Sequence, residues 1–216
     1  EYPAAYHQRI TAEAAADPSS AAAASVQVAD SPAAALKPAP LTAVSTTAPP
    51  ATSTLREQHL VFQENQRGVA FDKLFGPYLV GAKRIIVTDL YLRMFHQQRN
   101  LMELLETISR NSKPEDEVAV HVVTVEDEFS GDRQTENFEK MAAACTSVGI
   151  QFSWAYDTSG TKHDRDITTD HGWKIVLSRG LDVFQRCELN DAFSFANRMQ
   201  QHRQCKGFNV TFVRLQ

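Results

Sequence analysis

Three side chains whose types and spacing suit phosphate chemistry lie in the segment 163–170. His163 is followed by Arg165 two positions later and by Asp170 seven positions later. In an extended segment, residues two positions apart lie on one face, so His163 and Arg165 can grip the same phosphate. A guanidinium offers a planar fork of donors to phosphate oxygens, and an imidazole can transfer protons. The spacing therefore predicts phosphate recognition.

Each of these residues also has a purely structural interpretation. Arg165 can form an ion pair with Asp164 or Asp166 instead of binding a ligand. Asp170 can orient a histidine, or it can simply begin a turn. If the chain is an enzyme, His163 and Asp170 are its candidate catalytic residues. Both interpretations stay open on the sequence alone.

A second group of polar side chains follows the first strong strand-like run. Arg93, His96, Gln97 and Asn100 recur three or four positions apart, so they share one face of a helix. A helix that begins near Tyr91 would place Arg93 in its first turn, where the helix dipole favours an anion. Such a face can equally contact solvent alone. Its position directly after a strand favours a ligand site.

The run 173–182 supplies the remaining candidates. Arg179 ends a strand-like segment and Gly180 favours a tight turn, so Arg179 can join a pocket at the strand end. Asp182 is expected to pair with a nearby cation. The predicted ligand-binding residues are Arg93, His96, Arg99, His163, Arg165, Trp173 and Arg179. Tyr91 is predicted to form, with Trp173, the walls of the binding pocket.

No metal or cofactor is expected. The consecutive carboxylates Glu126, Asp127 and Glu128 would point to alternate faces of an extended segment, which is a poor arrangement for one ion. The sequence has no glycine-rich phosphate loop, paired-cysteine zinc motif or nucleophile elbow.

The elements that must position these residues alternate between strands and helices. Runs rich in β-branched residues, or alternating in polarity, predict strands at 60–62, 84–89, 118–125, 150–156, 173–177 and 209–213. Apolar residues at helical spacing predict helices at 69–79, 92–111 and 136–147. The predicted inner residues of the second helix are Phe95, Leu101, Leu104, Leu105 and Ile108. This order predicts an α/β domain with a mixed sheet flanked by helices.

Composition divides the chain into three parts. Residues 1–54 contain seven of the nine prolines and no phenylalanine or tryptophan, so they cannot bury enough apolar surface to offset the entropy of ordering. We interpret residues 1–16 as the tail of an upstream region and 17–54 as a disordered linker rich in Ala, Pro, Ser and Thr. Residues 55–216, with all 12 phenylalanines, have the length of one globular domain.

Charge and cysteine content limit the partners and the compartment. Two of the 22 basic and four of the 26 acidic side chains lie in residues 1–54, so residues 55–216 carry a net charge of −2. No overall basic field therefore attracts nucleic acid or anionic lipid. No apolar run approaches the ~20 residues of a membrane span, and no signal peptide is apparent. Three cysteines without ligand spacing predict a cytoplasmic protein, which can be peripheral at a membrane.

Four segments together resemble the C-terminal phospholipase-D-like domain of MIT-domain proteins (MIT_C): 89–104, 123–128, 163–167 and 172–182. The resemblance covers roughly residues 62–215, with Leu90 where proline is expected and Ser178 where glycine is expected. It implies a phospholipase-D-like fold without the paired catalytic motifs. For eukaryotic members it also implies binding of acidic phospholipids.

Phospholipase-D enzymes use the motif H-x-K-x-x-x-x-D, whereas this chain has Arg165 in place of the lysine and a single copy. The resemblance therefore favours a non-catalytic module, tethered to a larger protein, that binds a phosphate-bearing ligand such as an acidic phospholipid headgroup or recruits a protein partner. One alternative is a phosphodiesterase or nuclease active as a homodimer through two His163 residues. Another is the C-terminal accessory domain of a longer prokaryotic protein, an ATPase of a Lon-like phage-defence type.

Overall fold

The computed structural model describes residues 55–113, 115–160, 164–186 and 191–216. His163, together with the tail and linker predicted for residues 1–54, lies outside these ranges. The strands are β1 (Gln58–Phe62), β2 (Arg84–Asp89), β3 (Val118–Thr124), β4 (Ile150–Tyr156), β5 (Arg165–Thr169), β6 (Trp173–Leu177) and β7 (Phe208–Arg214). The helices are α1 (Phe71–Leu74), α2 (Gly76–Leu79), α3 (Phe95–Asn111), α4 (Gly131–Thr146), α5 (Phe195–Arg198) and the 3-10 turn η1 (Gln200–His202).

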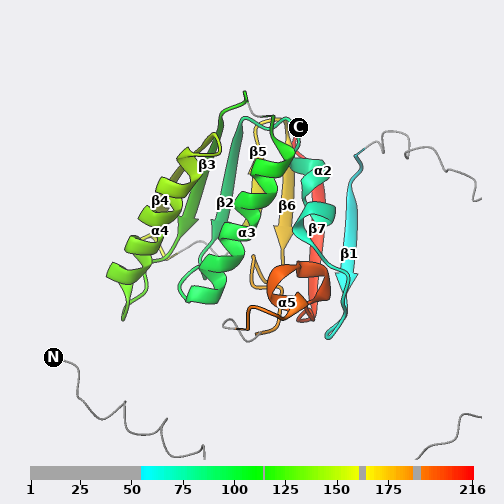
Figure 1. Ribbon diagram of the computed structural model, residues 1–216. Helices are drawn as coiled ribbons and strands as arrows, with labels where there is room; N and C mark the ends of the chain where they lie inside the picture. The colour runs from blue at the N-terminus through cyan, green and yellow to red at the C-terminus, as the bar shows by residue number, and fades with distance from the viewer. Residues whose placement is uncertain (1–54, 114, 161–163, 187–190) are drawn as a thin grey trace, which may run out of the picture. The chain divides into compact units, whose positions relative to one another are not determined.

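The described strands form one mixed sheet in the order β1-β7-β6-β5-β2-β3-β4 (Figure 1). Strands β2, β3 and β4 are parallel to one another, as right-handed β-α-β connections through α3 and α4 require. Strands β5, β6, β7 and β1 continue the sheet in antiparallel pairs. The prediction of an α/β domain with a mixed sheet is therefore confirmed.

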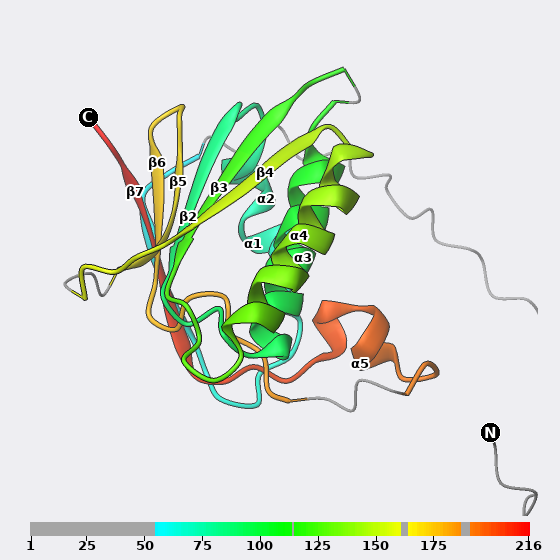
Figure 2. The same ribbon diagram turned by 90° about the vertical axis from the view of Figure 1, so that its left-hand side faces the viewer.

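Helices α1 to α4 all lie on one face of the sheet (Figure 2). Alternate residues of the strands point into this layer: Val118, Val120 and Val122 of β3 are fully buried, while the residues between them are partly exposed. The helices contribute Leu101, Leu104, Leu105 and Ile108 of α3 and Phe138 of α4, all at most 1 % exposed. Burying each such side chain contributes about 1.5–3 kcal/mol.

The opposite face of the sheet has no described helix over it (Figure 2). Polar side chains on this face pair with one another across strands, beside the exposed apolar residues Val61, Ile86 and Val176. The Nδ1 atom of His121 lies 2.9 Å from the hydroxyl of Ser153, and the ammonium of Lys174 lies 3.1 Å from the carboxylate of Asp166. Asp166 therefore pairs with Lys174 and not with Arg165.

Three predicted helix boundaries were wrong. The segment 69–79 forms two short helices, because Gly76 packs tightly against the Asn111 side chain and Pro77 starts a new turn. Helix α3 begins at Phe95 and not at 92, since the Gln97 side chain accepts hydrogen bonds from the backbone N–H groups of Arg93 and Met94. Helix α4 begins five residues earlier than predicted, at Gly131, in a polar turn without apolar spacing.

Two further differences concern β5 and Phe95. Strand β5 was not predicted as a strand, because its polar residues Asp166 and Thr168 obscure the apolar pattern. Its extended conformation is stabilised by backbone pairing with β2 on one side and β6 on the other. Phe95 was predicted to face the core, but it is 60 % exposed at the first position of α3. The apolar stripe of α3 reaches the sheet only from Leu101 onward.

Candidate functional site

The ends of neighbouring strands meet at one edge of the sheet, here called the carboxyl edge. Strands β2, β3 and β4 end there because they are parallel, and β6 ends there because it is antiparallel to β5. Strand β5 begins there, which places Arg165 opposite Asp89 in the strand register. Candidate residues 76 positions apart in the sequence thus become neighbours, at the edge where open α/β sheets hold ligands.

Asp89 is the structural anchor of this edge. Its carboxylate is buried and accepts the backbone N–H groups of Leu181 at 2.8 Å and Tyr91 at 3.1 Å. Burial raises the pKa of the Asp89 carboxyl above 3.8, while these two hydrogen bonds and the charge of Arg165 act in the opposite direction. Gly180, at φ +60°, passes so close that a Cβ atom would overlap the Asp89 carboxylate. Asp89 therefore fixes the turn after β6.

Two guanidinium groups gather at the ring of Tyr91, and we call Tyr91, Arg93 and Arg165 the Tyr91 cluster. The Cζ atom of Arg165 lies 4.1 Å from the ring centroid and that of Arg93 lies 5.9 Å from it. Arg165 also donates to the carbonyl of Ser178 at 2.7 Å. Among the described residues neither arginine forms an ion pair with a carboxylate, and both Nε atoms are buried without a hydrogen-bond partner.

Arg179 lies at the same edge but is engaged by backbone. Its Nε atom donates to the carbonyl of Gly207 at 2.9 Å, just before β7. The neighbouring Ser178, where the family resemblance leads one to expect glycine, accepts the backbone N–H of Asn209 through its hydroxyl. These bonds hold the end of β6 against β7, so Arg179 has a structural role beside its candidate role in binding.

The polar residues of α3 do not form a single solvated face. The Asn100 side chain donates to the carbonyl of Leu181 at 2.9 Å, and Gln97 caps the helix. His96 lies 3.6 Å from Asp182, which also pairs with Lys206 at 2.7 Å, as predicted for Asp182. Arg93 precedes the helix, so the argument that its first turn would hold an anion does not apply.

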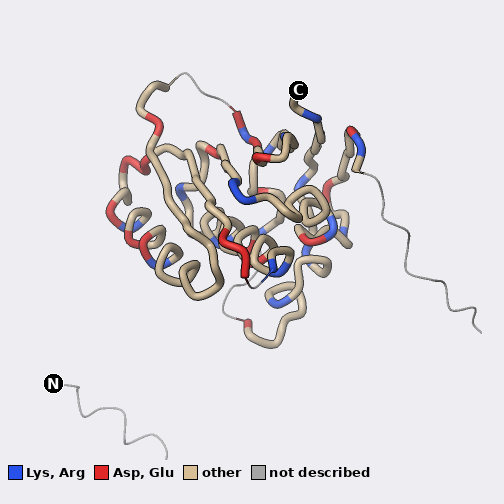
Figure 3. The backbone as a smooth tube through the Cα atoms, turned by 90° about the horizontal axis from the view of Figure 1, so that it is seen from above, with Lys and Arg blue, Asp and Glu red and all other residues tan. Residues whose placement is uncertain are grey.

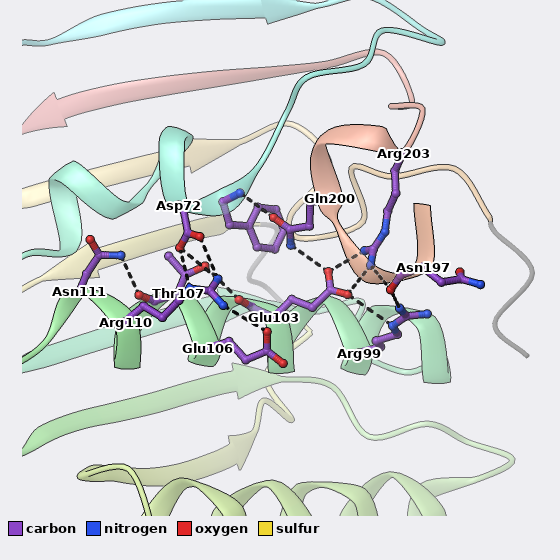
Figure 4. Close-up of polar contacts among 11 residues, drawn as sticks. Asp72, Arg99, Glu103, Glu106, Thr107, Arg110, Asn111, Asn197, Gln200 and Arg203 are labelled. Atoms are coloured by element: carbon purple, nitrogen blue, oxygen red, sulfur yellow. Dashed lines mark hydrogen bonds and ion pairs between the residues drawn. The ribbon is translucent and has the colours of Figure 1, made fainter. Parts of the chain in front are cut away.

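Arg99 belongs to a different group of side chains. Glu103 lies between the guanidinium groups of Arg99 and Arg203, and it also accepts a hydrogen bond from Gln200 (Figure 4). Arg203 is 5 % exposed and its two contacts with Glu103 measure 2.6 and 2.7 Å. The spacing of Arg99 and Glu103 is a local helix pair, but their contacts with Gln200 and Arg203, about a hundred residues later, leave no signal in the sequence.

Trp173 and Asp170 lie at the opposite edge of the sheet. Trp173, at the start of β6, is buried against Tyr78 with 5.0 Å between ring centroids. Asp170 follows the last residue of β5 and accepts the backbone N–H of Lys83. Asp170 lies five positions after Arg165 along an extended chain, a span of roughly 16 Å. The structure therefore does not bring either residue to the carboxyl edge.

The acidic loop after β3 is a local turn. Asp127 accepts hydrogen bonds from the hydroxyl and N–H of Ser130 and from the N–H of Phe129, and the Ser130 hydroxyl is the main cause that lowers its pKa. Within the described part of the chain, no cluster of His, Cys, Asp and Glu side chains could hold a metal ion. Acidic and basic residues are interspersed over the backbone (Figure 3).

The mixed sheet and the arginine side chains at its carboxyl edge are what the resemblance to a phospholipase-D-like domain leads one to expect. The sequence profile described as "Phospholipase D-like domain at C-terminus of MIT" matches residues 68–214, and the chain belongs to this family. The chain is also similar to MIT domain-containing protein 1 of Mus musculus, with 29 % identity over 131 residues that cover 60 % of this chain and 51 % of the mouse protein. It thus spans about half the length of that relative.

Proposed function

We propose that residues 55–216 form a non-catalytic domain that binds a phosphate-bearing ligand through the Tyr91 cluster at the carboxyl edge. The observation that carries the proposal is the pair of guanidinium groups, Arg93 and Arg165, beside one half-exposed ring and without an ion-pair partner among the described residues. A buried donor without an acceptor costs about 1–3 kcal/mol. An anion bound between the two arginines would offset this cost, and Arg is well suited to phosphate.

The position of Asp170 supports binding over turnover. In the H-x-R-x-x-x-x-D segment this carboxylate stands at the other end of β5, bonded to Lys83, so it cannot orient a group beside Arg165. The family resemblance suggests that the phosphate belongs to an acidic phospholipid headgroup. None of the described helices is long and apolar enough to span a membrane.

The test is sedimentation of the full chain with phosphatidylcholine vesicles, with and without phosphatidylserine. Arg93→Gln is the main variant, because the Arg93 side chain makes no hydrogen bond within the described residues. Arg165→Gln is the second. We expect each to weaken binding to the phosphatidylserine vesicles about tenfold, the value of one charge-assisted contact.

Arg214→Gln is the matched control, since it removes the same charge at the opposite edge, beside Trp173. If Arg214→Gln weakened binding to phosphatidylserine vesicles as much as Arg93→Gln, only net charge would matter and the proposal would be contradicted. Turnover of a chromogenic phosphodiester by the wild type that disappears in His163→Ala would favour the homodimeric phosphodiesterase instead.

A further inference from the structure

A second pocket lies beside the first turn of α3, apart from the Tyr91 cluster. It has a volume of about 270 Å³. Helix α3 supplies one wall, and the segments around Phe184 and Arg203 supply the other. Its lining includes Met94, Phe95, Arg99, Phe184, Arg186 and Arg203. None of them belongs to the Tyr91 cluster.

The pocket has more positive than negative charge. Arg99 and Arg203 share the single carboxylate of Glu103 (Figure 4), which leaves one positive charge uncompensated. Arg186 also lines the pocket, and its guanidinium has no hydrogen-bond or ion-pair partner in the part of the chain that the structure describes. The carboxylate of Asp182, near His96, is itself held by Lys206. An anionic group is therefore the ligand that this charge favours.

The rest of the lining is apolar and partly open to solvent. Phe95 is 60 % exposed and Met94 is 57 % exposed, although both are large apolar residues. Phe184 forms the inner wall, with the Cζ atom of Arg203 at 5.4 Å from its ring centroid. A flat apolar group entering the pocket would bury Phe95 and Met94, which the protein alone leaves exposed.

We propose that this pocket binds a small phosphomonoester attached to a flat apolar group, independently of the Tyr91 cluster. The phosphate would lie between Arg99 and Arg186, and the apolar group would lie against Phe95 and Met94. The volume is slightly below the range usual for drug-sized ligands, so it suits a single ring with its phosphate. Three of these residues, Met94, Phe95 and Arg186, were not among the ligand-binding residues predicted from the sequence.

The test is calorimetric titration of the full chain with phenyl phosphate, glycerol phosphate and inorganic phosphate. We expect phenyl phosphate to bind at least tenfold more tightly than the other two, because only it has a ring for Phe95. Arg186→Gln should lower the affinity for phenyl phosphate about tenfold. Phe95→Ala should lower the affinity for phenyl phosphate to the affinity for inorganic phosphate. Both side chains are exposed, so neither variant should disturb folding.

The controls separate this pocket from the Tyr91 cluster. Arg214→Gln, at the opposite edge of the sheet, should leave phenyl phosphate binding unchanged. Loss of phenyl phosphate binding in Arg93→Gln but not in Arg186→Gln would overturn the second pocket and leave the first site standing. Equal affinity for glycerol phosphate and phenyl phosphate would overturn the aromatic part of the assignment. If phenyl phosphate shows no saturable binding at millimolar concentration, the whole proposal of a second pocket is overturned.

Discussion

At the scale of single residues, the carboxyl edge shows how one buried carboxylate determines a turn far away in the sequence. Asp89 ends β2, yet its main partner is the backbone N–H of Leu181, after β6. The close approach is possible only because Gly180 has no side chain and adopts a positive φ. The pairing of β2 with β5 places Arg165 next to Asp89.

Replacing Gly180 should therefore be among the most damaging single changes in the domain. In Gly180→Ala the new Cβ would overlap the buried Asp89 carboxylate, in addition to the cost of a positive φ. We expect the free energy of unfolding to fall by about 3 kcal/mol or more, measured by urea denaturation. Gly81→Ala is the control, because Gly81 also has a positive φ, +79°, but has open space around its Cα. This account would be contradicted if Gly81→Ala lowered the free energy of unfolding by more than about 1 kcal/mol, or if Gly81→Ala and Gly180→Ala lowered it equally.

At the scale of elements, the segment containing α5 and η1 is attached to α3 mainly by polar contacts. Helix α5 has no buried residue, and neither does η1. Glu103 of α3 instead binds Arg203 and Gln200, and Arg203 further donates to the carbonyl of Ala196 at 2.6 Å. The Glu103 carboxylate thus joins both η1 and Arg203 to the helix layer (Figure 4).

Glu103→Gln should loosen this segment, because it leaves the buried Arg203 guanidinium without a counter-charge. Removing one partner of a buried ion pair costs about 3–5 kcal/mol, and we expect a loss near the lower value, since Glu103 is partly exposed. Amide hydrogen exchange should accelerate in residues 195–203 before the rest of the domain. Glu106→Gln, which removes only the exposed pair with Arg110, should change the free energy of unfolding by less than about 0.5 kcal/mol. Unchanged exchange in 195–203 would show that other contacts hold the segment.

At the scale of the whole molecule, the described apolar core runs from Val69 to Phe212, with Leu55, Leu60 and Phe62 packed against it. A chain of residues 55–216 should therefore have the same free energy of unfolding as the full chain, within about 0.5 kcal/mol. Urea denaturation of the two chains is the direct comparison. A clearly lower value for residues 55–216 would mean that residues 1–54 contribute to the fold, contrary to the linker predicted from their composition.

The sequence by itself was sufficient for the fold class and for most strands. The β-branched runs at 84–89 and 118–125 and the apolar spacing of α3 are local signals, because each reflects how one segment meets a single core layer. The same reasoning failed at Phe95, where α3 begins beyond the core, and at β5, where polar residues alternate with the buried Ile167. Both errors arise where a neighbouring element, and not local periodicity, decides burial.

The candidate site was divided by the tertiary structure alone. The sequence suggested that His96, Arg99, Arg165 and Trp173 share a site, but Arg165 and Asp170 stand at the two ends of β5, and therefore at opposite edges of the sheet. Strand order then put Arg165 beside Asp89 and Tyr91, and left Trp173 in the core. Sequence therefore supplied residue types suited to phosphate. Only the pairing of β2 with β5, and the packing of the Phe184 and Arg203 segments on α3, decided which of them meet.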